Sequence, residues 1–144
     1  MRDESGSAAW SAVLAVQRAA HASVRVLTAE LADLGLTGSE LNALANLAGD
    51  RARTVSQLAA AAGVRASTMT SVLDRLEARG LVTRGSAPGD RRAVQVRLTA
   101  GGRDAATAIT AAVAGMERRA LAGLPPGALA ALHAGLDALA QVAP

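Results

Sequence analysis

Arginine is concentrated in the middle third of the chain. Residues 51–103 contain ten arginines and only three acidic residues, which gives this segment a net charge of +7. Residues 1–50 carry −3 and residues 104–144 carry −1. Positive charge gathered in this way between two acidic segments is typical of a surface that binds a polyanion such as nucleic acid.

Short hydroxyl side chains follow one of these arginines. Residues 65–71 read Arg-Ala-Ser-Thr-Met-Thr-Ser and begin a segment with helical periodicity, expected over about 66–79. Small hydroxyl residues let a helix lie deep in a DNA groove and pair with donors or acceptors on bases and phosphates. We expect Thr68, Thr70 and Ser71 to contact DNA or solvent. Ser67 either caps the helix or contacts DNA.

A second group of charges lies in a loop. Residues 85–92 are rich in turn formers and separate two short β-branched segments, 81–84 and 94–98, which predict strands. We expect a β-ribbon that projects from the body with Arg91 and Arg92 at its tip. A guanidinium suits the negative potential of a narrow minor groove, although a solvated loop charge is the alternative. Asp90 would repel phosphate, so we expect it to orient Arg75 or a tip arginine.

Three further residues complete the candidate site. Arg75 follows Ser71 by four positions on the same helix face, so it either contacts phosphate or pairs with Asp90. Ser56 lies on the first turn of its helix and can offer phosphate a hydroxyl and backbone donors. Asp90 is the wing-positioning residue, and the expected DNA-binding residues are Ser56, Arg65, Ser67, Thr68, Thr70, Ser71, Arg75, Arg91 and Arg92.

The elements that must position these residues are mainly helices. A long helix is expected from Ser7 to Leu34, where Gly35 stops it. Capping boxes at residues 37–40 and 54–57 open two shorter helices. Gly63 then forms the turn before the hydroxyl-bearing helix.

Two more helices follow the ribbon. Thr99 caps a helix to about Leu121, a Pro-Pro-Gly break follows, and the last helix has leucines spaced by three and four. The outer helices are amphipathic but have no partner within the chain. The sole aromatic residue, Trp10, is interpreted as a packing anchor. Such a chain gains by burying its helix faces against a second copy, so we expect a homodimer.

This order predicts a mainly α fold with a small β-hairpin wing. The core is a winged helix-turn-helix flanked by N- and C-terminal dimerisation helices, within one domain of residues 1–144. The DNA-binding lobe spans about 37–99, and the dimerisation helices span about 7–34 and 100–142. The second helix of a helix-turn-helix enters the major groove of double-stranded DNA.

Composition argues against several other classes. Cysteine is absent, which excludes disulfides and thiolate zinc sites, and His21 and His133 are isolated, so we expect no metal and no cofactor. No Ser-His-Asp set, carboxylate pair or phosphate-binding glycine loop indicates an enzyme. No apolar run is long enough for a membrane span, and the acidic N-terminus does not resemble a secretory signal, so a cytoplasmic protein is expected.

Several stretches form one pattern: residues 36–40 and 54–59, the hydroxyl run from Ser67 to Thr70, the run from Leu73 to Val82, and Asp90-Arg91-Arg92 followed by residues 96–102. This pattern resembles the MarR family of bacterial transcription regulators. The outer helices match that family in number and order, so the resemblance covers nearly the whole chain. Arg65 departs from it, because a capping serine is common at that position.

The resemblance implies a triangular dimer in which the first and the last two helices of each copy interlock. Two winged lobes would read a pseudo-palindromic operator, with the helix from Ala66 to Arg79 in the major groove and Arg92 in the minor groove. Many members are repressors released by a small, often phenolic or anionic ligand bound between the dimer and DNA-binding regions. The sequence names neither the ligand nor the operator. The alternative function is a winged-helix module that binds protein and has no operator of its own.

Overall fold

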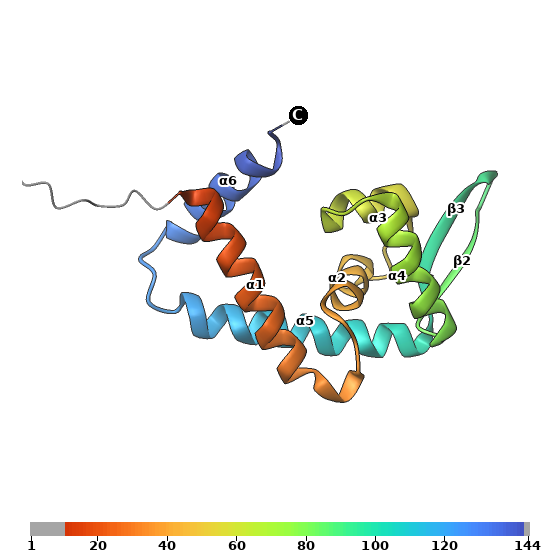
Figure 1. Ribbon diagram of the computed structural model, residues 1–144, viewed down its shortest axis with the longest axis horizontal. Coiled ribbons are helices and arrows are strands. Elements are labelled where there is room, and N and C mark those ends of the chain that lie inside the picture. Colours follow the sequence, from red (N-terminus) through yellow and green to blue (C-terminus); the bar gives the residue numbers. More distant parts are fainter. Residues whose placement is uncertain (1–10, 143–144) are drawn as a thin grey trace, which may run out of the picture.

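The computed structural model describes residues 11–142 of the chain, and Figure 1 shows their arrangement. A mainly helical body carries one small antiparallel sheet, which confirms the predicted fold class. The elements in chain order are α1 (Ala12–Glu30), the 3-10 turn η1 (Ala32–Leu34), α2 (Gly38–Leu47), β1 (Arg53–Thr54), α3 (Val55–Ala62), α4 (Ala66–Ala78), β2 (Val82–Ala87), β3 (Asp90–Leu98), α5 (Ala100–Leu121) and α6 (Ala128–Ala140). The interpretation of Trp10 and the expected helix start at Ser7 lie outside the described residues.

The two predicted capping boxes are both present. The Glu40 N–H donates to Thr37 Oγ1 (3.3 Å), and the Thr37 N–H donates to Glu40 Oε2 (2.9 Å). Thr54 and Gln57 make the same reciprocal pair at the start of α3. The backbone donors at the beginning of α2 and α3 are therefore satisfied locally, which fixes where each helix starts.

The first helix is shorter than expected. α1 ends at Glu30, and the chain tightens into η1 before Gly35 adopts the left-handed conformation, with φ 59°. A last turn of 3-10 type is common at helix C-termini because it satisfies carbonyls that an α-helix leaves unpaired. Leu31 and Leu34 pack against the core from this turn, so the chain bends towards α2 at this point.

The wing differs from the expected strands and loop. β2 and β3 continue pairing beyond the predicted segments, with Gly85 opposite Gln95 and Ser86 opposite Val94. Only Pro88 and Gly89 separate the strands, and Gly89 has φ 84°, as the third residue of a type II turn requires. The expected eight-residue tip was wrong because an exposed ribbon has no buried face to create an alternating pattern. The pairing depends on the backbone instead.

The sheet also contains a strand that the sequence did not indicate. β1 is only two residues long, and it pairs with the far edge of β3, with Arg53 opposite Val96. The strand order is therefore β1-β3-β2. A two-residue strand shows no periodicity, which explains why it was missed. It ties the start of α3 to the base of the wing.

One hydrophobic core holds the lobe together. It is formed by α2, α3, α4, the base of the sheet and the first half of α5, and the buried residues of α4 are Met69, Val72, Leu73 and Leu76. In contrast, α6 has no buried residue among those described, and its leucines are exposed: Leu129, Leu132, Leu136 and Leu139. None of the described helices is long and apolar enough to cross a membrane.

The start of α5 is locked against the base of the wing. The Thr99 N–H donates to the Leu81 carbonyl (3.1 Å), and the Thr99 hydroxyl donates to the Gly80 carbonyl (2.6 Å). Thr99 Oγ1 also accepts from the Gly102 N–H, which caps the helix as predicted. A Cβ at Gly102 would lie 1.9 Å from the Leu81 carbonyl oxygen, so only glycine permits this contact.

Glu40 is the buried charged residue of the described core, with 3% of its surface exposed. Its Oε1 accepts from Arg75 Nε on α4 at 2.9 Å. Burial by itself raises the pKa of the Glu40 carboxyl, but the hydrogen bond from the Thr37 backbone and the Arg75 guanidinium lower it by more. The pKa therefore lies below its ordinary value of 4.5, and the ionised carboxylate joins α2 to α4.

We predict that Glu40→Gln destabilises the fold by about 1–2 kcal/mol at neutral pH, because the amide keeps the capping box but loses the ion pair. Since folding lowers the Glu40 pKa, the carboxylate stabilises the protein above pH 4.5, and this contribution is lost as the pH falls through the lowered value. The difference between variant and wild type should therefore shrink in acid. Urea unfolding across this pH range measures it.

Glu30→Gln is the matched control, because Glu30 pairs with Arg119 on the exposed surface. Such a pair contributes no more than about 1 kcal/mol. A Glu40→Gln deficit that stays constant from neutral to acid pH would contradict the assigned role of the carboxylate.

Candidate nucleic-acid interface

The beginning of α4 differs from the beginning of α2 and of α3. Its N-cap residue is Arg65, and no side chain among the described residues caps the helix. Its first turn contains no acidic residue. Ser67 lies inside the first turn, so the alternative that Ser67 caps the helix was wrong. The first-turn N–H groups lack a side-chain acceptor, and the positive end of the helix dipole is not neutralised. This is the arrangement that a phosphate satisfies.

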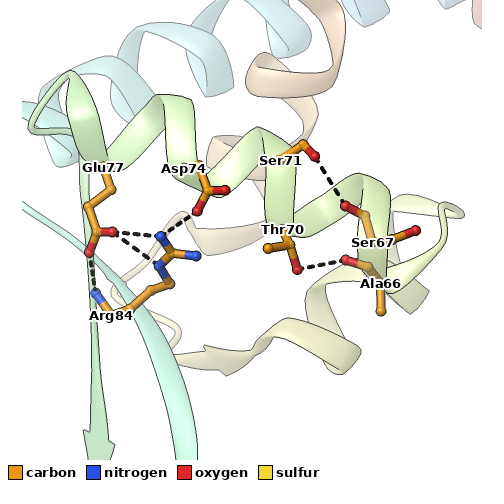
Figure 2. A network of polar contacts seen from close by, with 7 residues as sticks. All are labelled: Ala66, Ser67, Thr70, Ser71, Asp74, Glu77 and Arg84. Atoms are coloured by element: carbon orange, nitrogen blue, oxygen red, sulfur yellow. Dashed lines mark hydrogen bonds and ion pairs between the residues drawn. The ribbon is translucent and has the colours of Figure 1, made fainter.

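Four hydroxyl residues lie on the exposed side of α4, opposite its buried face. Figure 2 shows two of them bonded to the helix backbone: Thr70 Oγ1 donates to the Ala66 carbonyl (3.0 Å), and Ser71 Oγ donates to the Ser67 carbonyl (3.3 Å). Across residues 11–142, the hydroxyls of Ser67 and Thr68 have no partner. These two hydroxyls can donate or accept without breaking an existing bond. The hydroxyls of Thr70 and Ser71 already donate, so they remain free to accept.

Arg84 attaches the wing to this helix. Its Nη2 lies 2.6 Å from Asp74 Oδ1 and 2.7 Å from Glu77 Oε2, and its backbone N–H donates to Glu77 Oε1 at 3.3 Å (Figure 2). The hydrogen bond from Arg84 lowers the pKa of Glu77, and the same bond raises the pKa of Arg84, so the pair stays ionised. We missed this contact from the sequence. The available signal was a pair of acids, Asp74 and Glu77, three positions apart on one helix face. An arginine follows them on the next strand.

Asp90 positions the wing tip through the backbone. Its Oδ1 accepts from the Arg92 N–H at 2.9 Å. Asp90 therefore orients a tip arginine, Arg92, through its backbone, whereas the alternative that Asp90 orients Arg75 was wrong. An aspartate at a turn reaches the N–H two residues on more readily than a distant side chain. Arg91 and Arg92 are exposed beside it.

Arg75 pairs with Glu40 instead of Asp90, because α2 packs against α4 while the wing tip projects away from the lobe (Figure 1). Only its Nε is bonded, and 52% of its side chain is exposed. The rest of the guanidinium therefore faces solvent on the same helix as the hydroxyl residues.

Arg79 joins two parts of the lobe rather than only solvating the end of α4. Its guanidinium donates to the Leu34 carbonyl (2.6 Å) and the Gly35 carbonyl (2.9 Å), and it lies 3.9 Å from Glu40 Oε2. These bonds satisfy the last carbonyls of η1. Arg79 is therefore a structural residue that holds the segment between α1 and α2 against α4.

The arginines of residues 51–103 divide into two groups. Six are bonded to other parts of the protein, because Arg53, Arg97 and Arg103 also have partners, namely the Asn46 carbonyl, Gln95 and Asp50. The other four side chains bond no described residue: Arg51, Arg65, Arg91 and Arg92. Three of these belong to the predicted site, and Arg51 was missed. Its place at the start of the basic segment was the only signal.

The unbonded arginines surround the hydroxyl helix. Arg65 lies at the start of α4, and Arg91 and Arg92 lie at the tip of the ribbon that projects beside α4 in Figure 1. Arg51 borders a shallow hollow beside α3, together with Gln57 and small alanines, and Ser56 is exposed on the first turn of α3. In residues 11–142 no group of three or more histidines or acids could hold a metal ion. The exposed chemistry is that of a surface for phosphates and base edges.

Comparisons with known proteins agree with this geometry. The model of the MarR family matches residues 34–93. The transcriptional regulator PA3341 has 30% sequence identity and a TM-score of 0.77, with 88% of this chain and 91% of that chain covered. A MarR-family regulator from Silicibacter pomeroyi has 29% identity and a TM-score of 0.74, with 86% and 84% covered.

NadR in complex with 4-hydroxyphenylacetate has 25% identity and a TM-score of 0.80, with 90% of this chain and 92% of that chain covered. No curated protein matches the sequence. The family match covers the helix-turn-helix and the wing as far as the start of β3, and the solved structures extend the likeness over the outer helices. The chain therefore belongs to the MarR family of winged-helix transcription regulators.

Proposed function

We propose that the protein is a transcriptional repressor that binds a pseudo-palindromic operator as a homodimer and is released by a small-molecule ligand. The observation that carries the DNA-binding part is the pattern of unbonded groups. The four arginines of residues 51–103 that bond no described residue, and the partner-free hydroxyls of Ser67 and Thr68, lie on α4, beside α3 and at the wing tip. A regulator of transcription acts where the bacterial chromosome lies, so we also propose a cytoplasmic location.

Each part of this surface has a separate role in the proposal. Ser67 and Thr68 read base edges in the major groove, with Thr70 and Ser71 as acceptors further along α4. Arg91 and Arg92 enter the adjacent minor groove, whose narrow form attracts guanidinium groups. The residues that bind phosphates are Arg51, Ser56, Arg65 and Arg75, which fix the register of the helix in the groove.

The partner in the proposed dimer is a second copy of the chain. α6 exposes a stripe of leucines, and the first turns of α1 expose Val13, Leu14 and Val16. Apolar surface of this extent on two terminal helices favours burial against another protein. A two-fold dimer places its recognition helices about one helical turn of DNA apart, or a multiple of that, which is why the proposed operator is pseudo-palindromic.

The proposed ligand site lies between α1, α2 and α5. A cavity of about 280 Å³ is lined there by residues of all three helices, among them Leu27, Leu41 and Ile109. A wider hollow beside α5, bordered by Arg103, is less enclosed and touches neither α1 nor α6. The first cavity joins a proposed dimerisation helix to the lobe. A ligand there changes DNA affinity only if it binds one spacing of the two lobes more tightly.

We predict that Arg92→Ala weakens binding to the best operator by about tenfold or more, because a cation leaves the minor groove. The slope of log affinity against log salt should fall by about 0.9, the value for one phosphate neutralised. Fluorescence anisotropy at several salt concentrations measures both. Arg118→Ala is the control, because it removes the same charge from an exposed position on α5.

If Arg92→Ala keeps the affinity and the salt slope of the wild type, the wing does not contact DNA as proposed. If no DNA sequence outcompetes random DNA, the protein is instead a winged-helix module that binds protein.

We predict opposite effects of Arg65→Ser on stability and on DNA binding. A serine at the N-cap accepts a first-turn N–H and should stabilise the fold by about 1 kcal/mol. The loss of the cation should weaken DNA binding and reduce the salt slope by about 0.9. Thermal unfolding and anisotropy measure the two effects.

Arg65→Ala is the matched control, because it removes the charge without supplying a cap. It should weaken DNA binding equally and give no gain in stability. If Arg65→Ser binds DNA as tightly as wild type at every salt concentration, Arg65 does not contact phosphate.

A further inference from the structure

We infer that the effector of the cavity between α1, α2 and α5 is an uncharged, mainly apolar molecule of one or two rings, and not an anion. This inference rests on the proposed ligand release, because it names the class of ligand for the same site.

The lining of the cavity carries no ionisable side chain among the described residues. Val24, Leu27, Leu41, Ile109 and small alanines form most of its wall, and its polar side chains are those of Ser23 and Asn42. A carboxylate that entered would lose its hydration without gaining a cation. Burial of an unpaired charge is strongly unfavourable, whereas an apolar ring gains from leaving water.

The beginning of α2 does not replace the missing cation. Gly38 lines the cavity on the first turn of this helix, where the positive end of the dipole would favour an anion. However, the capping box already occupies this end: Thr37 Oγ1 accepts the Glu40 N–H, and the Glu40 carboxylate accepts the Thr37 N–H. The place of an anion is therefore taken by a carboxylate of the protein itself.

The two polar side chains offer neutral hydrogen bonds. Ser23 Oγ donates to the Ala19 carbonyl (2.7 Å), so its lone pairs remain to accept. Asn42 Oδ1 accepts from Asn46 Nδ2 (2.6 Å), which leaves the Asn42 amide N–H groups to donate. One acceptor and one donor at a largely apolar wall match a neutral phenol, aldehyde or amide.

The size of the cavity limits the ligand. A cavity of about 150 Å³ in another protein accommodates benzene. The cavity of about 280 Å³ therefore accommodates one or two rings. At one edge, Val24 of α1 contacts α2 so closely that a Cβ at Gly38 would lie 2.5 Å from Val24 Cγ1. A ligand that pushes Val24 aside thus moves α1 relative to the lobe.

The test compares neutral and anionic molecules with the same ring. The probes are benzamide against benzoate and 4-hydroxybenzamide against 4-hydroxybenzoate, each titrated calorimetrically into the full-length protein at neutral pH, where both acids are ionised and both amides are neutral. The neutral member of each pair should bind at least about tenfold more tightly. An anion that binds as tightly as its neutral partner overturns the inference. So does the absence of binding by both neutral probes at millimolar concentration.

Two variants locate the effect in the cavity. Asn42→Arg supplies the missing cation and should reverse the preference towards the anions. Ser39→Arg is the matched control, since it adds the same charge at an exposed position of α2 that does not line the cavity, and it should keep the neutral preference. Equal changes in both variants would mean that long-range charge and not the cavity sets the preference, which also overturns the inference.

DNA release distinguishes this inference from the proposed function. If a neutral probe binds but leaves DNA affinity unchanged, the ligand class holds and the proposed release fails. If an anion binds in the cavity and releases DNA, the release holds and the ligand class fails.

Discussion

The proposed DNA-binding surface depends on the ion pairs of Arg84 with Asp74 and Glu77. Within residues 11–142, the other side-chain hydrogen bonds and ion pairs of α4 do not reach the β2–β3 ribbon. Arg84 fixes the first strand of the wing against the exposed side of α4 (Figure 2). The bonds of Thr99 and the close approach at Gly102 fix the end of the wing against α5. A helix and a ribbon held at a fixed separation can enter two adjacent grooves of DNA at the same time.

The acids of the lobe leave the positive charge of residues 51–103 unevenly distributed over the surface. Glu40, Asp50, Asp74 and Glu77 each pair with an arginine and join separate elements. These arginines therefore contribute to the fold. The cations that remain lie beside α3, at the beginning of α4 and at the wing tip, so the free positive charge lies around α4. A similar division occurs among backbone groups: α2 and α3 carry full capping boxes, whereas the beginning of α4 lacks a cap within the described residues and suits a phosphate.

Local signals in the sequence predicted much of this fold. The Thr37 and Thr54 capping boxes, Gly63 and Thr99 placed the helix boundaries, because each acts through bonds to residues within a few positions. Contacts between distant elements could not be predicted: Arg75 with Glu40 spans 35 positions, and Arg79 reaches Leu34 and Gly35. For the same reason the alternative that Arg75 pairs with Asp90 was wrong, and Arg51 was left out of the candidate site. The length of the wing was underestimated because the pairing of an exposed ribbon leaves no hydrophobic pattern.

Methylation protection by dimethyl sulfate on the DNA that binds best from a random pool tests the central claim most directly. This reagent modifies guanine N7 in the major groove and adenine N3 in the minor groove, so one experiment reports contacts in both grooves. The account predicts protected guanines in two half-sites about one helical turn apart, or a multiple of it, flanked by protected adenines. In Arg92→Ala the adenine protection should disappear while the guanine protection remains. A selection that yields no common sequence, or protection that ignores both grooves, would contradict the account.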